Sequence, residues 1–244
     1  MNDIFHNIKA VLFDLDNTIF DHSRVQNNSL ALLYQEYRYI FNGTPLEDFR
    51  NKYIEHNDFV WNLLIQGKIT KDELRYRRIA DVLQHFSLDY SSSRAMTERY
   101  LEIYLDQSFF VEGAESVITA LQSRYRLGII TNGFKDVQSI KIDKLGVRES
   151  FEVIVMSEDL GVMKPDRKIF QKALDALQCP SEAVLFVGDN YETDILGAAE
   201  AGMPTVWYNP AGAGLKIPAG RPRPTRYVTS LTDVVALLEN KTPG

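Results

Sequence analysis

Two carboxylates near the N-terminus are the first residues in this chain whose types and spacing suit chemistry. Asp14 and Asp16 come directly after the apolar run 10–13, which reads Ala-Val-Leu-Phe. Carboxylates at the end of a buried strand are costly unless a cation lies close to them, because burial disfavours their charged form. The spacing therefore predicts a cationic partner between or above the two side chains.

Three further groups of polar residues stand later in the chain, and two of them also follow apolar runs. The groups are Thr131-Asn132-Gly133, Lys164-Pro165, and Gly188-Asp189 with Asp194. In an open α/β sheet, ligand sites form outside the carboxyl ends of the strands. We therefore expect these polar groups to converge with Asp14 and Asp16 at one edge of a sheet.

The order of these four groups resembles the haloacid dehalogenase (HAD) superfamily, whose motifs are an Asp nucleophile pair, a Ser or Thr, a Lys and a terminal acidic pair. The resemblance covers nearly the whole chain. Segments 61–75, 130–134 and 164–170 look like those of the pyrimidine 5'-nucleotidase and N-acylneuraminate-9-phosphatase group. The resemblance implies an enzyme, a Mg²⁺-dependent phosphatase that hydrolyses a small phosphomonoester.

In that interpretation the two N-terminal carboxylates have different catalytic tasks. Asp14 is the candidate nucleophile, and its attack on phosphorus would form an aspartyl-phosphate, which splits one hard hydrolysis into two easier steps. Asp16 is placed to act as general acid toward the leaving oxygen and then as base for the attacking water. Carbon–halogen hydrolases of the superfamily lack this second Asp, so Asp16 favours the phosphatase branch.

The substrate phosphate needs hydrogen-bond donors and a positive charge. Thr131 supplies a hydroxyl, and the backbone amides of Asn132 and Gly133 can point toward phosphate oxygens. Lys164 adds a charge that neutralises the side of the nucleophile and stabilises the transferring group. Pro165 fits the first turn of the helix expected after it.

A Mg²⁺ site would draw on acidic oxygens. Asp14 and Asp189 are the expected carboxylate ligands, and the resemblance adds the backbone carbonyl of Asp16. Asp194 is a candidate ligand. It could instead orient metal-bound waters or Lys164 without binding the ion itself. It also suits the first turn of a helix. Asn190 is equally suited to bonding a metal-bound water and to capping the following helix.

Outside residues 20–107, short continuous apolar runs alternate with helical segments, which is typical of strands buried on both faces of a parallel sheet. The runs are 10–13, 127–130, 153–156, 184–187 and 205–208, with a last strand expected around 226–228. Helix candidates are 113–124, 136–146, 166–178, 192–201 and 231–239. The segment 210–224, rich in Gly and Pro, is expected to be an irregular loop. The pattern predicts a doubly wound, Rossmann-like α/β fold.

Residues 20–107 have helical apolar spacing instead, interrupted at 42–45, 67–68 and 91–93. We predict about four helices in this segment. Residues 1–19 and 108–244 then form the core domain, and the position of the insert resembles a type 1 HAD cap.

Several residues in and near the insert have both a substrate-binding and a structural interpretation. Trp61 and Phe134 suit stacking on a base or sugar as well as core packing. Arg75 and Arg78 share a helix face that could meet an anionic group or be solvated. His22 and Arg24 suit substrate contact or a linker. Tyrosines 34, 37, 39, 53 and 76 suit a dimer face or the core of the insert.

Composition narrows the class of protein and its partners. The chain has 244 residues, 45% hydrophobic and 25% charged, which is typical of a globular protein. A net charge of −6 argues against a nucleic-acid polymer or an anionic membrane as partner. With one cysteine, Cys179, and no long apolar segment, we expect a cytoplasmic protein, either a monomer or a homodimer.

The sequence thus predicts a phosphatase acting on a small phosphorylated metabolite, such as a nucleoside 5'-monophosphate or a sugar phosphate. Two alternatives remain open. One is a 2-haloacid dehalogenase-type hydrolase, against which Asp16 argues. The other is a non-catalytic protein on the same fold, because fold alone does not determine function.

Overall fold

The structure is a computed structural model that describes residues 4–212, 217 and 219–239. Contacts between Cα atoms divide the chain into two compact units, one formed by Met1–His22 with Ser108–Gly244 and the other by Ser23–Gln107. The first boundary lies three residues beyond the expected one at residue 19. Phe20 belongs to the first unit because it is fully buried there and forms bridges to Asp16 and Phe110.

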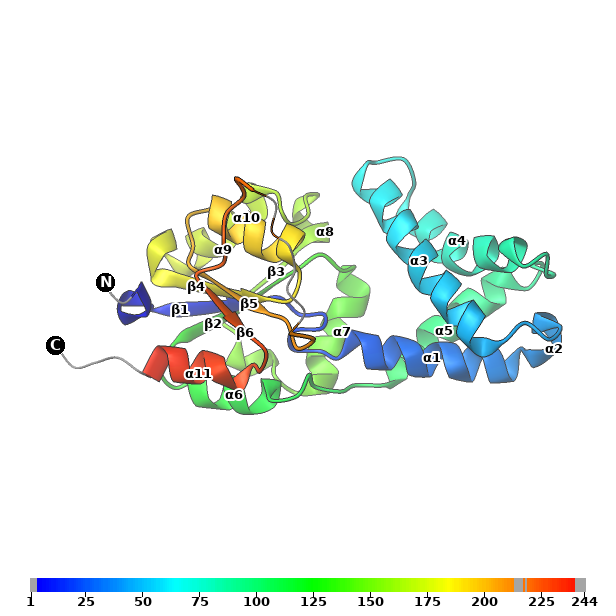
Figure 1. Cartoon of the computed structure of the whole chain (residues 1–244), viewed down its shortest axis with the longest axis horizontal. Coiled ribbons are helices and arrows are strands. Elements are labelled where there is room, and N and C mark those ends of the chain that lie inside the picture. Colours follow the sequence, from blue (N-terminus) through cyan, green and yellow to red (C-terminus); the bar gives the residue numbers. More distant parts are fainter. Residues whose placement is uncertain (1–3, 213–216, 218, 240–244) are drawn as a thin grey trace. The chain divides into compact units, whose positions relative to one another are not determined.

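The first unit, which we call the core unit, is built on a six-stranded sheet in the order β3-β2-β1-β4-β5-β6 (Figure 1). All neighbouring strands are parallel, which confirms the predicted fold class. The strands are β1 (Ala10–Phe13), β2 (Arg126–Thr131), β3 (Val153–Met156), β4 (Val184–Gly188), β5 (Thr205–Tyr208) and β6 (Arg226–Val228). Residues 213–216 and 218 of the expected loop 210–224 lie outside the described residues.

The central strands β1 and β4 are apolar and fully buried because helices cover both faces of the sheet. Helices α9 (Arg167–Leu177) and α10 (Leu196–Glu200) cover one face, and α6 (Ala114–Leu121) and α11 (Thr232–Glu239) cover the other (Figure 1). Helix α7 (Lys135–Leu145) follows β2 directly. The remaining short helices are η1 (Ile4–Asn7), η2 (Arg148–Ser150), α8 (Ser157–Leu160) and η3 (Ser181–Ala183).

Two details after Lys164 and Asp189 differ from the helices expected from the sequence. Pro165 lies before α9 rather than in its first turn, because Asp166 is the N-cap and its carboxylate accepts a hydrogen bond from the Lys168 amide. The segment after Asp189 begins as a π-helical turn, η4 (Tyr191–Ile195), before α10. Turns of this type occur often at functional sites.

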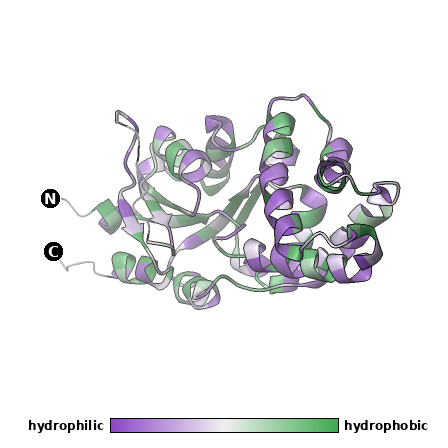
Figure 2. Ribbon diagram, turned by 45° about the vertical axis from the view of Figure 1, so that its right-hand side comes forward, coloured by the Kyte–Doolittle hydropathy of each residue, from purple (hydrophilic) through white to green (hydrophobic). Residues whose placement is uncertain are grey.

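The second unit, which we call the helical unit, is a bundle of α1 (His22–Glu36), α3 (Leu46–Ile65), α4 (Lys71–His85) and α5 (Ser93–Asp106). A short helix, α2 (Arg38–Phe41), was not expected. A capping box of Thr70 and Glu73 begins α4. The hydropathy colouring shows hydrophobic and hydrophilic residues on different sides of these helices (Figure 2).

The tyrosines of the helical unit do not form one exposed face. Tyr53 is fully buried, whereas Tyr39 is 76% exposed and Tyr34 and Tyr37 are half-buried. No helix in the described part of the chain has the length and hydrophobicity needed to cross a membrane.

Candidate active site

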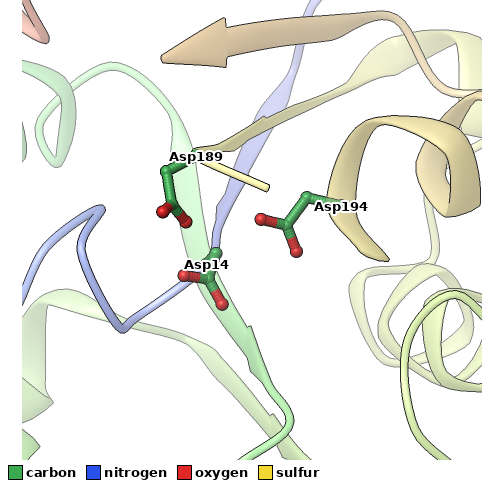
Figure 3. Close-up of side chains that lie close together, drawn as sticks. All are labelled: Asp14, Asp189 and Asp194. Carbon is green, nitrogen blue, oxygen red and sulfur yellow. The ribbon is translucent and has the colours of Figure 1, made fainter. Parts of the chain in front are cut away.

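Three carboxylates converge at the carboxyl end of the sheet. Asp14 follows β1, Asp189 follows β4, and Asp194 lies in η4 (Figure 3). One carboxylate oxygen of each lies within 4.8 Å of those of the other two. The Gly188 position makes room for this arrangement, because a Cβ there would lie 2.5 Å from Asp194 Oδ2. The strands β1 and β4 are neighbours at the point where the chain order reverses, where open sheets bind ligands.

The ammonium group of Lys164 contacts two of these carboxylates. Its Nζ lies 2.5 Å from Asp14 Oδ1 and 2.7 Å from Asp194 Oδ1. All three side chains are buried, with Lys164 only 3% exposed. Asp194 also accepts hydrogen bonds from the Asn190 amide and the Thr193 hydroxyl, so its carboxylate is oriented from several sides.

Three carboxylates lie near a single lysine, and their burial and mutual repulsion shift the pKa values of this group. Burial raises the pKa of Asp14 to about 7 although the nearby Lys164 lowers it, and repulsion from Asp194 and Asp16 adds to the increase. Burial, and then repulsion from Asp14 and Asp194, raises the pKa of Asp189 to about 8. Although burial of Lys164 favours its neutral amine, Asp14 and Asp194 raise its pKa above the usual value. A second cation would relieve this repulsion, and the hard oxygen donors fit Mg²⁺.

The side chain of Asn132 joins the turn after β2 to the segment that carries the lysine. Asn132 Nδ2 donates to the Lys164 carbonyl over 3.0 Å, and the Lys164 amide donates to Asn132 Oδ1 over 2.7 Å. The amide group thus satisfies both backbone groups of Lys164. It positions the lysine through its main chain, a role that the sequence did not indicate.

Thr131 is buried at the end of β2 and takes part in a polar network with α7. Its Oγ1 accepts hydrogen bonds from the Gly133 amide over 3.3 Å and from Gln138 Nε2 over 2.6 Å. Gly133 is required here because a Cβ at this position would lie 2.2 Å from Gln138 Nε2. The glycine therefore admits the Gln138 side chain, in addition to any approach of its own backbone to a ligand.

Asp16 is held by α7 and lies outside the group of three carboxylates. Its Oδ2 accepts from Gln138 Nε2 over 2.8 Å, and its Oδ1 accepts from Lys141 Nζ over 2.7 Å. Burial works against its charged form, but Lys141, His22 and the hydrogen bond from Gln138 lower the pKa of Asp16 to about 2. In this conformation Asp16 is ionised, and both its oxygens are engaged.

Gln138 and Lys141 are site residues that the sequence analysis missed. They are 0% and 5% exposed, and Gln138 Oε1 is buried with no hydrogen-bond partner among the described residues. Lys141 Nζ also lies 4.9 Å from the centre of the Phe20 ring. Their spacing of three residues on one helix face was the available signal, but polar residues at that spacing are common on solvated helices.

The structure places several residues for which the sequence allowed both a binding and a structural role. The Asn190 side chain caps η4, because its Oδ1 accepts from the amides of Glu192 and Thr193. His22 lies close enough to Asp16 for its positive charge to lower the pKa of that carboxyl. Phe134 is buried at the N-cap of α7, and Trp61 is half-buried in the helical unit.

Comparison with known proteins identifies the family. The model of the haloacid dehalogenase-like hydrolases matches residues 8–202. The chain is 31% identical to pyrimidine 5'-nucleotidase YjjG of Escherichia coli over 200 residues, which cover 82% of this chain and 85% of YjjG. It is 25% identical to N-acylneuraminate-9-phosphatase of Mus musculus over 252 residues, covering 96% of this chain and 94% of that protein.

A solved structure agrees with this result over nearly the whole chain. The magnesium-bound crystal structure of YfnB from Bacillus subtilis matches with a TM-score of 0.82 and 27% identity, covering 95% of this chain and 99% of YfnB. The four motifs, the sheet that carries them and the matching family model lead to one conclusion. The protein is an enzyme of the haloacid dehalogenase-like hydrolase family.

Proposed function

We propose that this enzyme is a Mg²⁺-dependent phosphomonoesterase that works through phosphorylation of Asp14. The observation that carries the proposal is the group of Asp14, Asp189 and Asp194 at the carboxyl end of the sheet, in which Lys164 contacts Asp14 and Asp194. The named activities of the relatives, a pyrimidine 5'-nucleotidase and an N-acylneuraminate-9-phosphatase, support the same reaction class.

In the first step, an oxygen of Asp14 attacks phosphorus and the bond from phosphorus to the ester oxygen breaks. The electron pair of that bond goes to the leaving oxygen, which takes a proton from Asp16 as the alcohol leaves. Lys164 keeps Asp14 in place and offsets the charge of the transferring group. The hydroxyl of Thr131 and the amides of Asn132 and Gly133 would bind phosphate oxygens.

In the second step, water attacks the phosphorus of the aspartyl-phosphate, and Asp16 accepts a proton from it. The bond between phosphorus and Asp14 then breaks and inorganic phosphate leaves. The ionised state of Asp16 in this structure suits that second step. Donating a proton in the first step requires Asp16 to gain a proton when substrate binds.

Carboxylates of Asp14 and Asp189 would hold Mg²⁺, with the Asp16 carbonyl as a further oxygen ligand and Asp194 as a ligand or a support for Lys164. When bound, the ion would offset the charge of these carboxylates and polarise a phosphoryl oxygen. Removal of that repulsion keeps Asp14 ionised for attack.

For the substrate, we propose a nucleoside 5'-monophosphate or a sugar phosphate, in keeping with the relatives. We also propose that the helical unit is a type 1 cap. A cap inserted at this place in the chain would exclude water from the first step and select the leaving group.

Phosphate release from a panel of substrates tests the proposal. The panel contains pyrimidine and purine 5'-monophosphates, sugar phosphates and p-nitrophenyl phosphate, each with Mg²⁺ or with EDTA. The blank is Asp14→Asn, and the matched control is Asp233→Asn, an exposed aspartate at the start of α11. We expect Mg²⁺-dependent release by the wild type and the control, and none by the blank.

The covalent intermediate is tested by acid quenching during turnover. Phosphate retained on Asp14 and removed by hydroxylamine would identify an acyl phosphate. A folded, Mg²⁺-loaded protein that releases no phosphate from any compound would overturn the proposal. Halide release from a 2-haloacid that persists in EDTA would favour the dehalogenase reaction instead.

A further inference from the structure

One peptide group in the active site is held at both of its polar ends. The peptide that joins Asp189 to Asn190 accepts a hydrogen bond at its carbonyl oxygen from Trp207 Nε1 over 2.8 Å. Its N–H group donates to Asp194 Oδ2 over 3.1 Å. Because a peptide group is planar, two bonds at its opposite edges fix its orientation. Since β4 holds the residue before Asp189, the Cα atom of Asp189 is fixed from both sides.

The other main-chain bonds of this turn are local. Four amides of η4 donate to the side chain or to the carbonyl oxygen of Asn190, and these bonds give the turn its shape. The bond from Trp207 comes from outside the turn, because this residue lies on β5, where it pairs in register with Gly188 of β4. Trp207 therefore joins the turn that carries Asp189 to the neighbouring strand of the sheet.

The indole of Trp207 is itself held in place by its surroundings. Trp207 is only 3% exposed, and its ring centre lies 5.4 Å from that of Tyr191 and 5.9 Å from that of Tyr227. The Tyr191 hydroxyl donates to the Pro222 carbonyl over 2.8 Å, which fixes one of these rings in turn. A buried indole N–H group needs an acceptor, and the Asp189 carbonyl is that acceptor here. The packing thus keeps the indole in the orientation that makes this bond.

The carboxylates that this turn carries have a physical reason to separate. One oxygen of Asp189 lies within 4.8 Å of those of Asp14 and Asp194 (Figure 3), and like charges at such distances repel one another. A turn free to rotate would let the Asp189 carboxylate move away from the other two. Bringing it back when a cation binds would reduce the affinity, whereas a carboxylate that is already in place avoids this cost.

We propose that Trp207 is a positioning residue of the metal site, and that its indole N–H group holds the Asp189–Asn190 peptide so that two carboxylates are in place before a divalent cation binds. The two carboxylates are those of Asp189, which precedes the peptide, and Asp194, which accepts its N–H. The inference rests on the proposed function in one respect, namely that the site binds Mg²⁺. It does not depend on the identity of the substrate.

Removal of the N–H group from Trp207 tests the proposal with little change in the shape of the side chain. The chain has two tryptophans, so Trp61→Phe gives a parent protein in which a tryptophan analogue enters only at position 207. In β-(3-benzothienyl)alanine, sulfur replaces the N–H group and the size of the aromatic ring system is kept. Calorimetry without substrate measures Mg²⁺ binding. We expect the parent to bind as the wild type does, and the analogue protein to bind about tenfold more weakly.

Two ordinary variants accompany the analogue. Tyr227→Phe is the matched control, because it removes a hydroxyl from an exposed tyrosine and keeps the ring that packs against Trp207, so Mg²⁺ affinity should not change. Trp207→Phe loses the same N–H group as the analogue, and its smaller ring should also lower the melting temperature. Equal Mg²⁺ affinity of the analogue protein and its parent would overturn the proposal, because the bond would then contribute only to folding.

Kinetics separate the positioning of metal ligands from general damage to the site. In the analogue protein, the Mg²⁺ concentration that gives half-maximal phosphate release should rise about tenfold, in step with the weaker binding. At saturating Mg²⁺, kcat and KM should be close to those of the parent, because the bound cation then holds the carboxylates itself. A kcat that stays low at saturating Mg²⁺, with an unchanged requirement for Mg²⁺, would contradict the proposal.

The two proposals fail in different ways. If the wild type binds Mg²⁺ but hydrolyses no compound of the earlier panel, the proposed phosphatase function is wrong, and calorimetry still decides on Trp207. If phosphate is released and loss of the N–H group leaves Mg²⁺ affinity unchanged, the role of Trp207 is rejected while the function stands. A folded wild type that binds no Mg²⁺ rejects the metal site and the role of Trp207 together.

Discussion

Lys164 contacts two buried carboxylates at once, and this defines the chemistry of the centre at the residue scale. Its Nζ is within 2.7 Å of both Asp14 and Asp194. A buried ion pair adds little to stability compared with apolar packing, but removal of one partner leaves a buried charge without compensation. The arrangement is therefore more easily explained by its use in catalysis than by its contribution to folding.

Lys164→Met should expose this dependence. In EDTA we expect a loss of about 3 kcal/mol in the free energy of unfolding, because two buried carboxylates lose their cation. Mg²⁺ should restore part of that loss, while phosphate release should stay abolished. Urea unfolding with and without Mg²⁺ measures both, with the exposed Lys168→Met on α9 as control. A variant as stable as wild type in EDTA would contradict the argument.

Lys141→Met tests how Asp16 is positioned. Lys141 and Gln138 each hold one oxygen of Asp16, so loss of Lys141 should impair proton transfer to the leaving group. We expect kcat for a nucleoside monophosphate to fall about 100-fold, the scale of general acid catalysis. Turnover of p-nitrophenyl phosphate should fall far less, because p-nitrophenolate leaves without a proton. Exposed Lys144→Met on the same helix is the control; equal losses for both substrates would show a general effect on folding.

At the scale of elements, the turn from β2 into α7 organises one side of the site. Thr131 ends the strand, Gly133 forms the turn, and Gln138 reaches back from the helix to both Thr131 and Asp16. The missing side chain of Gly133 is what allows this close approach. The helix thus links the expected phosphate-binding group to the expected acid–base group.

Gly133→Ala should disturb this link by steric overlap. Its Cβ would meet the Gln138 amide, so we expect a loss of about 1–3 kcal/mol in stability, together with lower activity. Shortening the opposing side chain in Gly133→Ala/Gln138→Ala should recover stability but not activity, because Asp16 and Thr131 still lack the amide. Thermal unfolding and phosphate release of both variants make the comparison. Failure of the double variant to recover stability would mean that the alanine strains the backbone instead.

At the scale of the whole molecule, parallel strands gather residues that are far apart in the sequence. Asp14 and Lys164 are 150 positions apart and form a hydrogen bond in the folded chain. The fold also brings like charges together, and burial together with their repulsion raises the pKa values of Asp14 and Asp189. Global stability should therefore depend on protons and on metal.

The sign of the pH dependence follows from linkage. The folded-state pKa values of Asp14 and Asp189 are about 7 and 8, whereas the ordinary value of an aspartate is 3.8. At any pH between the ordinary value and these raised values, the folded state therefore binds more protons than the unfolded state. Without metal, the free energy of unfolding should then fall by about 1 kcal/mol or more as the pH rises from about 5 to about 8. The low pKa of Asp16 adds no slope in this range.

Bound Mg²⁺ should oppose the fall in the free energy of unfolding that occurs as the pH rises. Mg²⁺ competes with the protons on these carboxylates, so its stabilisation should be larger at the alkaline end of that range than at the acidic end. Urea unfolding with Mg²⁺ or EDTA measures this, and Asp189→Asn should reduce both the pH slope and the Mg²⁺ effect. Stability that is independent of pH in EDTA would show that the carboxylates do not repel one another as described.

The strands and the residues that follow them could be predicted because their signals are local. Continuous apolar runs indicate strands buried on both faces, and Asp14, Thr131 and Asp189 stand at the ends of three such runs. The expected helices also appear within a few residues of their predicted bounds. Helix ends were less certain, since the cap at Asp166 and the π-helical turn at Tyr191 depend on local hydrogen bonds.

The sequence by itself therefore determined the α/β fold class, the helical insert and the edge of the sheet where the acidic residues meet, because periodicity and strand order suffice for these. Only the tertiary structure decided which groups pair there. Asp16 pairs with Gln138 and Lys141, which lie 122 and 125 residues further along the chain. Such pairings depend on how side chains pack between elements, and no local pattern in the chain encodes that packing.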